Sequence, residues 1–279
     1  MNNAIIIGGD DRQRELYGIL TAQGLKCKYI NSSDEAEKIN GIKQKDIIIL
    51  PVPLSKDKEN IYSSNKSLSI RINDVLKRTD KTNMIFAGSI PKTLKAYLDE
   101  KEITFIDYLD SEETVQYNAY LTGLGAVKLL MENTKEDIRY KKTLVTGFGR
   151  VAEFTAQALK NVGCDVYITA RNKLRLSKAE CMGYKTIDLD KISSFMYLFD
   201  YIFNTVPVNI FTAEDVSHIK GRYFELASAP FGADKAFFIN RENDYFDGGA
   251  LPGRYFSRSA AEKLAEITLK HINLRNGGD

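Results

Sequence analysis

Short apolar runs alternate with amphipathic stretches along this chain, which is the rhythm of βαβ units that form a parallel sheet. In the first half, five apolar runs predict strands; they are Ala4–Ile7, Cys27–Ile30, Asp46–Leu50, Asn83–Ala87 and Ile103–Ile106. Helices are expected at Arg12–Gln23 and Lys92–Lys101, and the polar stretch Ser55–Leu68 predicts a surface loop. Residues 1–110 therefore predict one α/β domain.

A long helical stretch separates this domain from the next. Ser111–Met131 predicts a helix with acidic residues in its first turn, and residues 111–140 are interpreted as an interdomain connection. Asn118, Gly123 and Gly125 interrupt the helical pattern. Because small residues weaken a helix, they indicate that its backbone comes close to another element or to a ligand.

The second half repeats the α/β rhythm. Six further strands are expected, at Lys142–Thr146, Asp165–Thr169, Tyr184–Ile187, Tyr201–Asn204, Tyr223–Leu226 and Tyr245–Asp247. Residues 141–256 predict a Rossmann domain, and residues 257–279 a C-terminal helix and tail. The predicted fold class is α/β: two Rossmann-like, doubly wound parallel-sheet domains joined by a long interdomain helix.

Composition and charge narrow the function classes. Hydrophobic residues make up 43% of the 279, and 39 basic against 37 acidic residues give a net charge of +2, which favours neither nucleic acid nor an anionic membrane as a partner. No apolar run approaches a membrane span, and the N-terminus does not resemble a signal peptide. Three cysteines without metal-ligand spacing and two widely separated histidines, His218 and His271, predict no metal site and a cytoplasmic protein with reduced thiols.

The most informative motif is the turn G-F-G-R-V-A at residues 147–152, between a β-branched strand and an amphipathic helix. That context matches the dinucleotide-binding fingerprint, in which glycines allow a tight turn and a close approach of the backbone to the pyrophosphate. The pyrophosphate then meets the free N–H groups of the helix N-terminus. The predicted cofactor-binding residues here are Gly147, Gly149, Arg150, Val151 and Ala152. The alternative is a tight turn that binds no ligand.

The following strand indicates which cofactor is bound. NAD sites usually carry Asp or Glu at the end of this strand, about 20 residues after the fingerprint, to bind the ribose 2′-hydroxyl. Here the sequence is Thr-Ala-Arg-Asn-Lys at residues 169–173. The Arg171 guanidinium is suited to bidentate hydrogen bonding with a 2′-phosphate, and the Lys173 ammonium adds a positive point charge. NADP is therefore the predicted cofactor, and a solvated basic turn is the alternative.

Two later turns also follow predicted strands of this half. Ligands of such folds bind outside the carboxyl ends of the strands, so Asn204, Thr205, Val206 and Pro207 are predicted to contact the cofactor. Residues 226–230 (L-A-S-A-P) end the next strand in the same manner. Both segments are equally consistent with simple strand-ending turns.

Over essentially its full length the chain resembles the dipicolinate synthase A-subunit family of spore-forming bacteria. Several ordered segments carry the resemblance: G-G-D-D-R-Q at 8–13, Asn118, Gly125-Ala126, residues 147–152, Ala170-Arg171, residues 204–207, 226–228, and G-A-L-P-G at 249–253. The sequence departs from the family at Leu124, Ala229 and Phe231, where Glu, Arg and Gly are usual.

The resemblance implies NADP-dependent oxidation of a dihydrodipicolinate to dipicolinate in the mother-cell cytoplasm during sporulation. It also implies the flavoprotein-like B subunit of dipicolinate synthase as partner, and a homo-oligomer is a further expectation. A planar dicarboxylate is bound by cations, hydroxyls and backbone N–H groups. The candidate substrate-binding residues are Arg12, Ser89, Asn118, Ser228, Leu251, Pro252 and Gly253. Arg12 is equally consistent with a solvent-facing helix residue, and no catalytic residue is assigned.

Two other functions stay open. A D-2-hydroxyacid dehydrogenase shares the two-domain plan, but its chemistry normally needs a histidine as acid–base group. The segment at residues 251–253 holds none, and His218 and His271 are poorly placed for the role. The second alternative is a non-catalytic, NADP-binding subunit that organises its partner, which the departures from the family pattern keep open.

Overall fold

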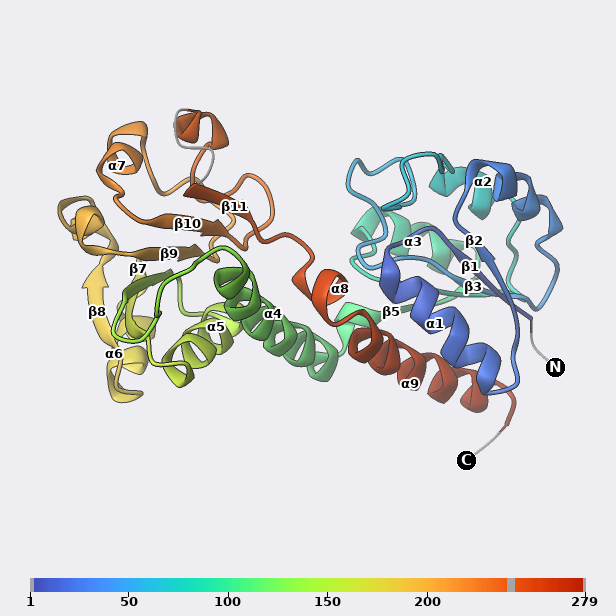
Figure 1. Cartoon of the computed structure of the whole chain (residues 1–279). Helices are drawn as coiled ribbons and strands as arrows, with labels where there is room; N and C mark the ends of the chain where they lie inside the picture. The colour runs from blue at the N-terminus through green and yellow to red at the C-terminus, as the bar shows by residue number, and fades with distance from the viewer. Residues whose placement is uncertain (1–2, 240–243, 278–279) are drawn as a thin grey trace. The chain divides into compact units, whose positions relative to one another are not determined.

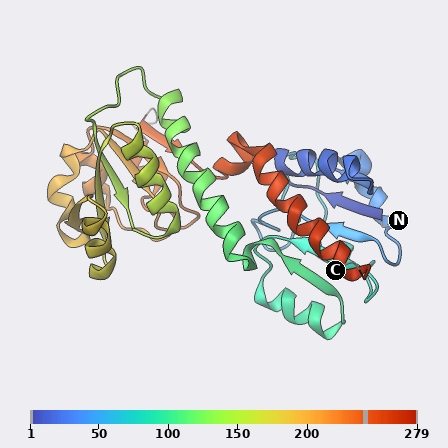
Figure 2. The ribbon, with the colours of Figure 1, turned by 90° about the horizontal axis from the view of Figure 1, so that it is seen from below.

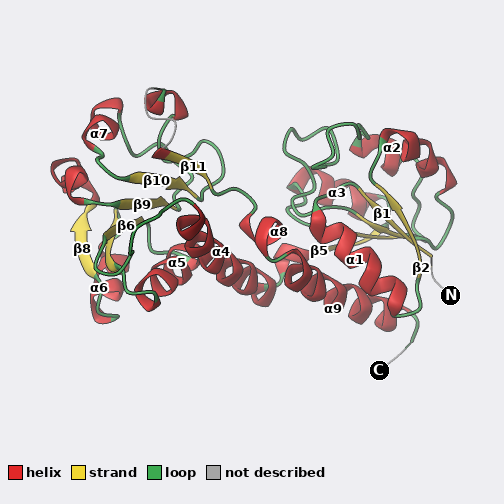
Figure 3. Cartoon of the chain, in the orientation of Figure 1, coloured by secondary structure: helices red, strands yellow, loops and turns green. Residues whose placement is uncertain are grey.

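The computed structural model describes residues 3–239 and 244–277, which divide into two compact units. Unit 1 comprises residues 1–115 and 253–279, and unit 2 comprises residues 116–252. Each unit is an α/β structure with an all-parallel sheet, so the predicted fold class is confirmed (Figure 1, Figure 3). None of the described helices combines the length and apolar character that crossing a bilayer requires.

The sheet of unit 1 has five strands in the order β2-β1-β3-β4-β5. The strands are β1 (Asn3–Ile7), β2 (Lys26–Ile30), β3 (Ile47–Ile49), β4 (Met84–Ala87) and β5 (Thr104–Asp107). The helices are α1 (Asp11–Ala22), α2 (Ile72–Leu76), α3 (Lys92–Glu100) and α9 (Ser257–Arg275), with short 3-10 segments η1 (Ser33–Gly41) and η2 (Tyr108–Asp110). This strand order places a switch point between β1 and β3, the usual ligand edge of such a sheet.

Alternation along the strands of unit 1 supplies two cores, one on each face of the sheet. Ile5 and Ile7 belong to one cluster, whereas Ala4 and Ile6 belong to the other, as a period of two requires. Helices α1 and α9 lie side by side over the second face (Figure 2). The buried Tyr108 hydroxyl lies 2.7 Å from Thr268 Oγ1 and so ties α9 to the end of β5.

The sheet of unit 2 has six strands in the order β11-β10-β9-β6-β7-β8, the arrangement of a dinucleotide-binding Rossmann fold. They are β6 (Lys142–Thr146), β7 (Asp165–Ala170), β8 (Lys185–Asp188), β9 (Tyr201–Asn204), β10 (Arg222–Glu225) and β11 (Tyr245–Asp247). The helices are α5 (Arg150–Asn161), α6 (Lys173–Cys181) and α7 (Ala213–His218), with 3-10 segments η3 (Leu189–Leu198) and η4 (Lys235–Phe238). The switch point lies between β6 and β9.

The long helix α4 (Glu112–Glu132) and the short helix α8 (Leu251–Tyr255) both contain a boundary between the units. Helix α4 runs without a break through the positions that disturb its sequence pattern. A Cβ atom on Gly123 would lie 2.7 Å from the Phe154 carbonyl of α5, so this glycine allows the close helix approach that its sequence indicates. The contact is within unit 2.

The division of the chain differs from the sequence-based boundaries in two respects, because the predicted interdomain segment 111–140 is divided at residue 115 and the last helix joins unit 1. The sequence predicts a separate C-terminal helix and tail over residues 257–279, whereas α9 packs into the core of unit 1 through Ala261, Leu264 and Ala265. The first domain is thus completed by the last helix. The sequence pattern shows that α9 has an apolar face, but only the packed structure shows what that face covers.

Candidate functional site

The turn between β6 and α5 contains two glycines that serve different purposes. Gly147 has a φ of +79°, a conformation that favours glycine, and its N–H donates to the Thr169 carbonyl oxygen at 2.7 Å. Gly149 has a φ of −103°, which any residue can adopt. A Cβ atom there would meet only Arg175 Nη1, at 3.6 Å. Gly149 is therefore not required by the backbone conformation or by a close contact, and the absence of a side chain leaves the space beside it open.

That open space lies at the N-terminus of α5. Gly149 is the N-cap residue and has no side chain with which to accept from the first-turn N–H groups. Arg150 follows as an exposed residue, Val151 is half-buried, and Ala152 is 1% exposed, which allows α5 to approach the sheet. Free N–H groups and the positive end of the helix dipole suit this position to a phosphate group.

The carboxyl end of β7 carries the two predicted 2′-phosphate ligands in different settings. Arg171 directly follows β7 and is exposed, and no carboxylate stands at residues 169–173. Lys173 forms a hydrogen-bonded ion pair with Asp188 at the end of β8, and this bond to Lys173 lowers the pKa of the Asp188 carboxyl. The structure thus leaves Arg171 facing solvent and pairs Lys173 with a protein carboxylate.

The polar side chains of the turn after β9 are bonded within the protein. Asn204 is fully buried; its Oδ1 accepts from Thr146 Oγ1 at 2.5 Å, and its Nδ2 donates to the Val206 carbonyl at 2.9 Å. Thr205 Oγ1 donates to the Thr146 carbonyl at 2.6 Å. Asn204 and Thr205 therefore shape the turn through their side chains. Val206 and the exposed Pro207 form its outer part.

This turn meets the glycine turn directly. A Cβ atom on Gly147 would lie 2.9 Å from Val206 Cγ2 and 3.2 Å from Thr205 Oγ1. The carboxyl ends of β6 and β9 are neighbours in the sheet, with Thr146 paired to Asn204. Two of the predicted cofactor segments, residues 147–152 and 204–207, are therefore brought together at the switch point of the sheet.

A buried carboxylate that the sequence pattern did not single out organises the next strand end. Glu225, the last residue of β10, is 1% exposed. Its carboxylate accepts from Asn204 Nδ2 at 2.6 Å, the Tyr223 hydroxyl at 3.0 Å, Ala227 N at 3.0 Å and Gly232 N at 2.9 Å. Burial raises the pKa of Glu225, and the hydrogen bonds from Asn204 and the two amides oppose that shift. A charged residue that ends a buried apolar strand is the signal that could have identified it.

Glu225 holds the turn that carries the predicted substrate residue Ser228. That segment runs from Ala227 to Gly232, and its amides at both ends donate to the carboxylate. Ser228 is exposed, and its carbonyl accepts from Phe231 N at 3.1 Å. Phe231, one of the departures from the family pattern, has a φ of +66° and a side chain that is 39% exposed. Glu225 thus holds the turn at Ala227 and Gly232, and Ser228 between them is exposed.

In unit 1 the structure buries the candidate Arg12, which is only 5% exposed and so does not face solvent. Its Nε and Nη2 atoms donate to the two carboxylate oxygens of Asp10 at 2.9 and 2.7 Å, and Nη2 also donates to the Val52 carbonyl at 2.5 Å. A Cβ atom on Gly253 would lie 2.9 Å from Arg12 Nε. Arg12 and Gly253, two of the predicted substrate-binding residues, are therefore neighbours.

Ser89, at the carboxyl end of β4, is presented by a buried carboxylate. Asp107 accepts from Ser89 N at 3.0 Å and from Ile90 N at 2.8 Å, and its carboxylate lies 3.2 Å from Lys95 Nζ. Ser89 has a φ of +58° and an exposed side chain. Asp107 at the end of β5 was not identified from sequence, although it holds this turn in its unusual conformation.

The remaining candidates lie in unit 2. Asn118 is half-buried on α4, and its carbonyl accepts from Thr122 Oγ1 at 2.7 Å. Leu251 and Pro252 are buried, and a Cβ atom on Gly125 would lie 2.8 Å from Leu251 Cβ. Leu251 is thus packed against α4. Leu124, another departure from the family pattern, is half-buried on the same helix.

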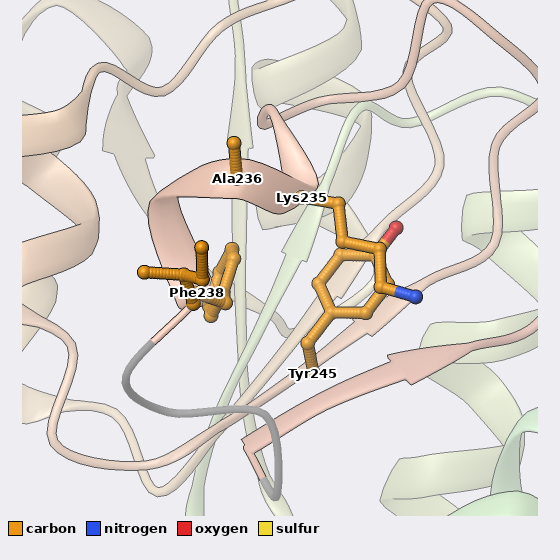
Figure 4. A pocket seen from close by; sticks show the side chains of 5 residues that line it. Lys235, Ala236, Phe238 and Tyr245 are labelled. Carbon is orange, nitrogen blue, oxygen red and sulfur yellow. The ribbon is translucent and has the colours of Figure 1, made fainter.

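A separate pocket of about 530 Å³ lies at the edge of unit 2, between η4 and β11 (Figure 4). Lys235, Ala236, Phe238, Ile239 and Tyr245 line it, and Lys235 Nζ lies 5.7 Å from the Tyr245 ring centroid. It shares no lining residue with the glycine turn or with any predicted site residue. Among the residues that the structure describes, no group of His, Cys, Asp or Glu is arranged to hold a metal ion.

Comparison with known proteins agrees with the resemblance inferred from sequence. Residues 3–109 match the family model for the N-terminal domain of the dipicolinate synthase A subunit. The chain is 26% identical over 281 residues to the A subunit of dipicolinate synthase from Bacillus subtilis, an alignment that covers 95% of this chain and 94% of the relative.

Solved structures show the same fold. The A subunit of dipicolinate synthase from Bacillus halodurans superposes with a TM-score of 0.77 at 21% identity, covering 96% of this chain and 97% of the other. The apo-structure of Escherichia coli D-lactate dehydrogenase superposes with a TM-score of 0.66 at 12% identity, covering 99% and 98%. Together these solved structures show that the chain shares its two-domain fold with a dipicolinate synthase A subunit and with a D-lactate dehydrogenase.

Proposed function

We propose that this chain oxidises a dihydrodipicolinate to dipicolinate with NADP. Its residues 3–109 match the family model for the N-terminal domain of the dipicolinate synthase A subunit, and 95% of the chain aligns with the Bacillus subtilis A subunit. One observation carries the cofactor assignment. The space beside Gly149 at the N-terminus of α5 is open, and the residue that follows the adjacent strand β7 is the cation Arg171 rather than a carboxylate. These residues fit a dinucleotide that bears a 2′-phosphate.

The protein's part in this chemistry is mainly to bind and orient. When bound, NADP⁺ supplies the hydride acceptor. The dihydropyridine ring gives up one hydride and one proton and becomes aromatic, so the reaction gains most of its driving force from the substrate itself. Gly149 and Arg171 would bind the phosphates, and the turn at residues 204–207, shaped by Asn204 and Thr205, would border the nicotinamide end.

The candidate substrate-binding residues differ in what they offer. Arg12 is locked by Asp10 through Nε and Nη2, which leaves the N–H groups of Nη1 for a substrate carboxylate. Ser89 and Ser228 present exposed side chains on turns that Asp107 and Glu225 hold from behind. We include Asn118 and residues 251–253 in the proposal as groups that border the substrate.

The similarity to one subunit of a synthase implies an assembly. Such a protein works with at least one partner subunit, and we propose the flavoprotein-like B subunit of dipicolinate synthase in that role. The proposed setting is the mother-cell cytoplasm during sporulation.

Calorimetric titration of the purified chain with NADP and with NAD tests the cofactor assignment. We expect NADP to bind more tightly, and Arg171→Asp to reduce NADP affinity at least tenfold more than NAD affinity, since charge-assisted hydrogen bonds contribute about 1.5–3 kcal/mol and about 1.4 kcal/mol is tenfold. Lys185→Ala is the control, because Lys185 lies at the start of β8, at the opposite end of the strands from the predicted cofactor site. Equal losses for both cofactors in Arg171→Asp would contradict the assignment.

The reaction itself is tested by the appearance of NADPH absorbance when dihydrodipicolinate is supplied. Turnover by the chain alone, or only together with the B subunit, supports the proposal and distinguishes an autonomous from a partner-dependent enzyme. Turnover of a D-2-hydroxy acid instead would replace the proposal with the dehydrogenase alternative. NADP binding without any turnover in the mixture would indicate a non-catalytic, partner-organising subunit.

A further inference from the structure

The start of α6 is set by its N-cap, and an ion pair connects α6 to the first turn of α5. Its N-cap residue, Asn172, accepts from Leu174 N at 2.9 Å and from Arg175 N at 3.3 Å, which sets where the helix begins. One turn further along, Lys178 Nζ lies 2.7 Å from both carboxylate oxygens of Glu153 on α5. The residues between these two points are therefore held beside the first turn of α5.

Arg175 lies between them and reaches the glycine turn. Its Nη1 atom would be 3.6 Å from a Cβ atom on Gly149, the glycine through which the backbone is expected to approach the pyrophosphate. Arg175 is exposed, and its guanidinium makes no ion pair within residues 3–239 and 244–277. Nothing in the described chain neutralises it.

This placement is unfavourable unless an anion binds there. The N-terminus of α5 carries a partial positive charge, and its N-cap residue Gly149 provides no side-chain hydrogen bond. A guanidinium beside such a helix end is repelled by it in the absence of a ligand. The neighbouring cations of α6 behave differently, because Lys173 pairs with Asp188 and Lys178 with Glu153.

We infer that Arg175 is a cofactor-binding residue that contacts the pyrophosphate of the dinucleotide, and that it supplies the second cation of the site. This inference rests on the proposed function. The assignment to the pyrophosphate follows from position: Arg175 approaches Gly149 at the head of α5, whereas Arg171 stands at the end of β7, where the 2′-phosphate is expected. Arg171 would then select NADP, and Arg175 would strengthen the binding of either dinucleotide.

Titration of single variants with three ligands tests this division. The ligands are NADP, NAD and ADP-ribose, the last of which has the pyrophosphate but no 2′-phosphate or nicotinamide. We expect Arg175→Leu to weaken all three by a similar factor of about ten, because one charge-assisted contact is lost in each case. Arg171→Leu should weaken NADP alone, and the control Lys185→Leu, at the start of β8, should leave all three affinities unchanged.

Other results would overturn the inference. Loss confined to NADP in Arg175→Leu would place that residue on the 2′-phosphate, and unchanged affinities would remove it from the site. Failure of the unsubstituted chain to bind any of the three ligands would instead contradict the proposed function. Thermal melting of each variant separates a binding effect from unfolding, and little change is expected because the Arg175 guanidinium forms no ion pair with the described residues.

Discussion

In each unit the first strand of the sheet is followed by a glycine turn and a helix, yet the two helix N-termini differ in what bonds to them. In unit 2 the turn at residues 147–149 ends in an uncapped helix with open space in front of Gly149. In unit 1 the turn at Gly8 and Gly9 leads to a helix whose N-cap, Asp10, forms a capping box with Gln13. The donors that a phosphate would need in unit 1 are already bonded to protein side chains.

The chain itself also covers the turn of unit 1. Gly9 N donates to the Tyr62 carbonyl at 2.7 Å, and Ser64 N donates to the Gly9 carbonyl at 2.8 Å. These residues belong to the polar segment 55–68, which has no long helix or strand, as predicted, but buries Ile61 and Leu68 as it covers the end of β1. A glycine turn thus indicates a dinucleotide site only where the helix end and the space before it stay free.

We expect the strongest change when the glycine turn of unit 2 is given an N-cap carboxylate like that of unit 1. Gly149→Asp adds an N-cap carboxylate, which we expect to stabilise α5 by up to about 1 kcal/mol. The same carboxylate would repel the pyrophosphate and accept hydrogen bonds from the α5 N–H groups that the pyrophosphate needs. The affinities for NADP and for NAD should therefore each fall about a thousandfold, or roughly 4 kcal/mol.

Calorimetry and thermal melting together measure both effects. Gly41→Asp is the control, since it adds the same charge to open space in unit 1 and should leave binding intact. Retained dinucleotide affinity in Gly149→Asp would show that the cofactor does not bind at α5.

The next largest effect is expected on the stability of unit 1. In Gly8→Ala the new Cβ atom would lie 2.7 Å from the Tyr62 carbonyl oxygen, on a backbone with a φ of +67°. Displacing the covering segment and straining the turn should cost about 2–4 kcal/mol in unfolding free energy.

Chemical denaturation monitors this loss, with Gly18→Ala as the control. Gly18 lies within α1 with nothing near its Cβ position, so alanine there should stabilise the helix by about 0.5–1 kcal/mol. Equal stabilities for the two variants would mean that residues 61–64 do not hold the turn of unit 1.

The smallest effect concerns Glu225 and the pH dependence of stability. Burial raises the pKa of this carboxyl above its ordinary value of 4.5, so between pH 4.5 and the raised value the folded chain holds a proton that the unfolded chain has lost. The contribution of Glu225 to stability therefore falls as pH rises through this window. Glu225→Gln removes that titration, although it disturbs the hydrogen bonds from Asn204 and the two amides.

Denaturation across a pH series should show the Gln variant gaining stability relative to the unsubstituted chain as pH rises above 4.5. Tyr223→Phe removes one donor to the carboxylate, so the pKa of Glu225 should rise further and the window should widen. A difference between the Gln variant and the unsubstituted chain that does not vary with pH would contradict the role assigned to burial.

The local features of this protein can be predicted from its amino-acid sequence. Short apolar runs predict the bounds of most strands within one or two residues, as at β9 and β11. Strands of a parallel sheet are buried on both faces, so their residues form continuous apolar runs. The short helices α6 and α7 escape prediction, since their apolar residues are too few for a clear period. The glycine spacing and the absence of a carboxylate after β7 are equally local, so the cofactor prediction follows from the amino-acid sequence alone.

Which of these polar groups are paired within the protein depends on how distant segments pack together. Lys173 and Arg175 are both cations near the start of α6, but Asp188, 15 residues beyond Lys173, pairs with Lys173. The hydrogen bonds from Gly9 N to the Tyr62 carbonyl and from Asn204 Nδ2 to Glu225 likewise connect residues that are distant in the chain. A polar group's availability depends on what folds against it, and burial and pairing are properties of packing rather than of the motif.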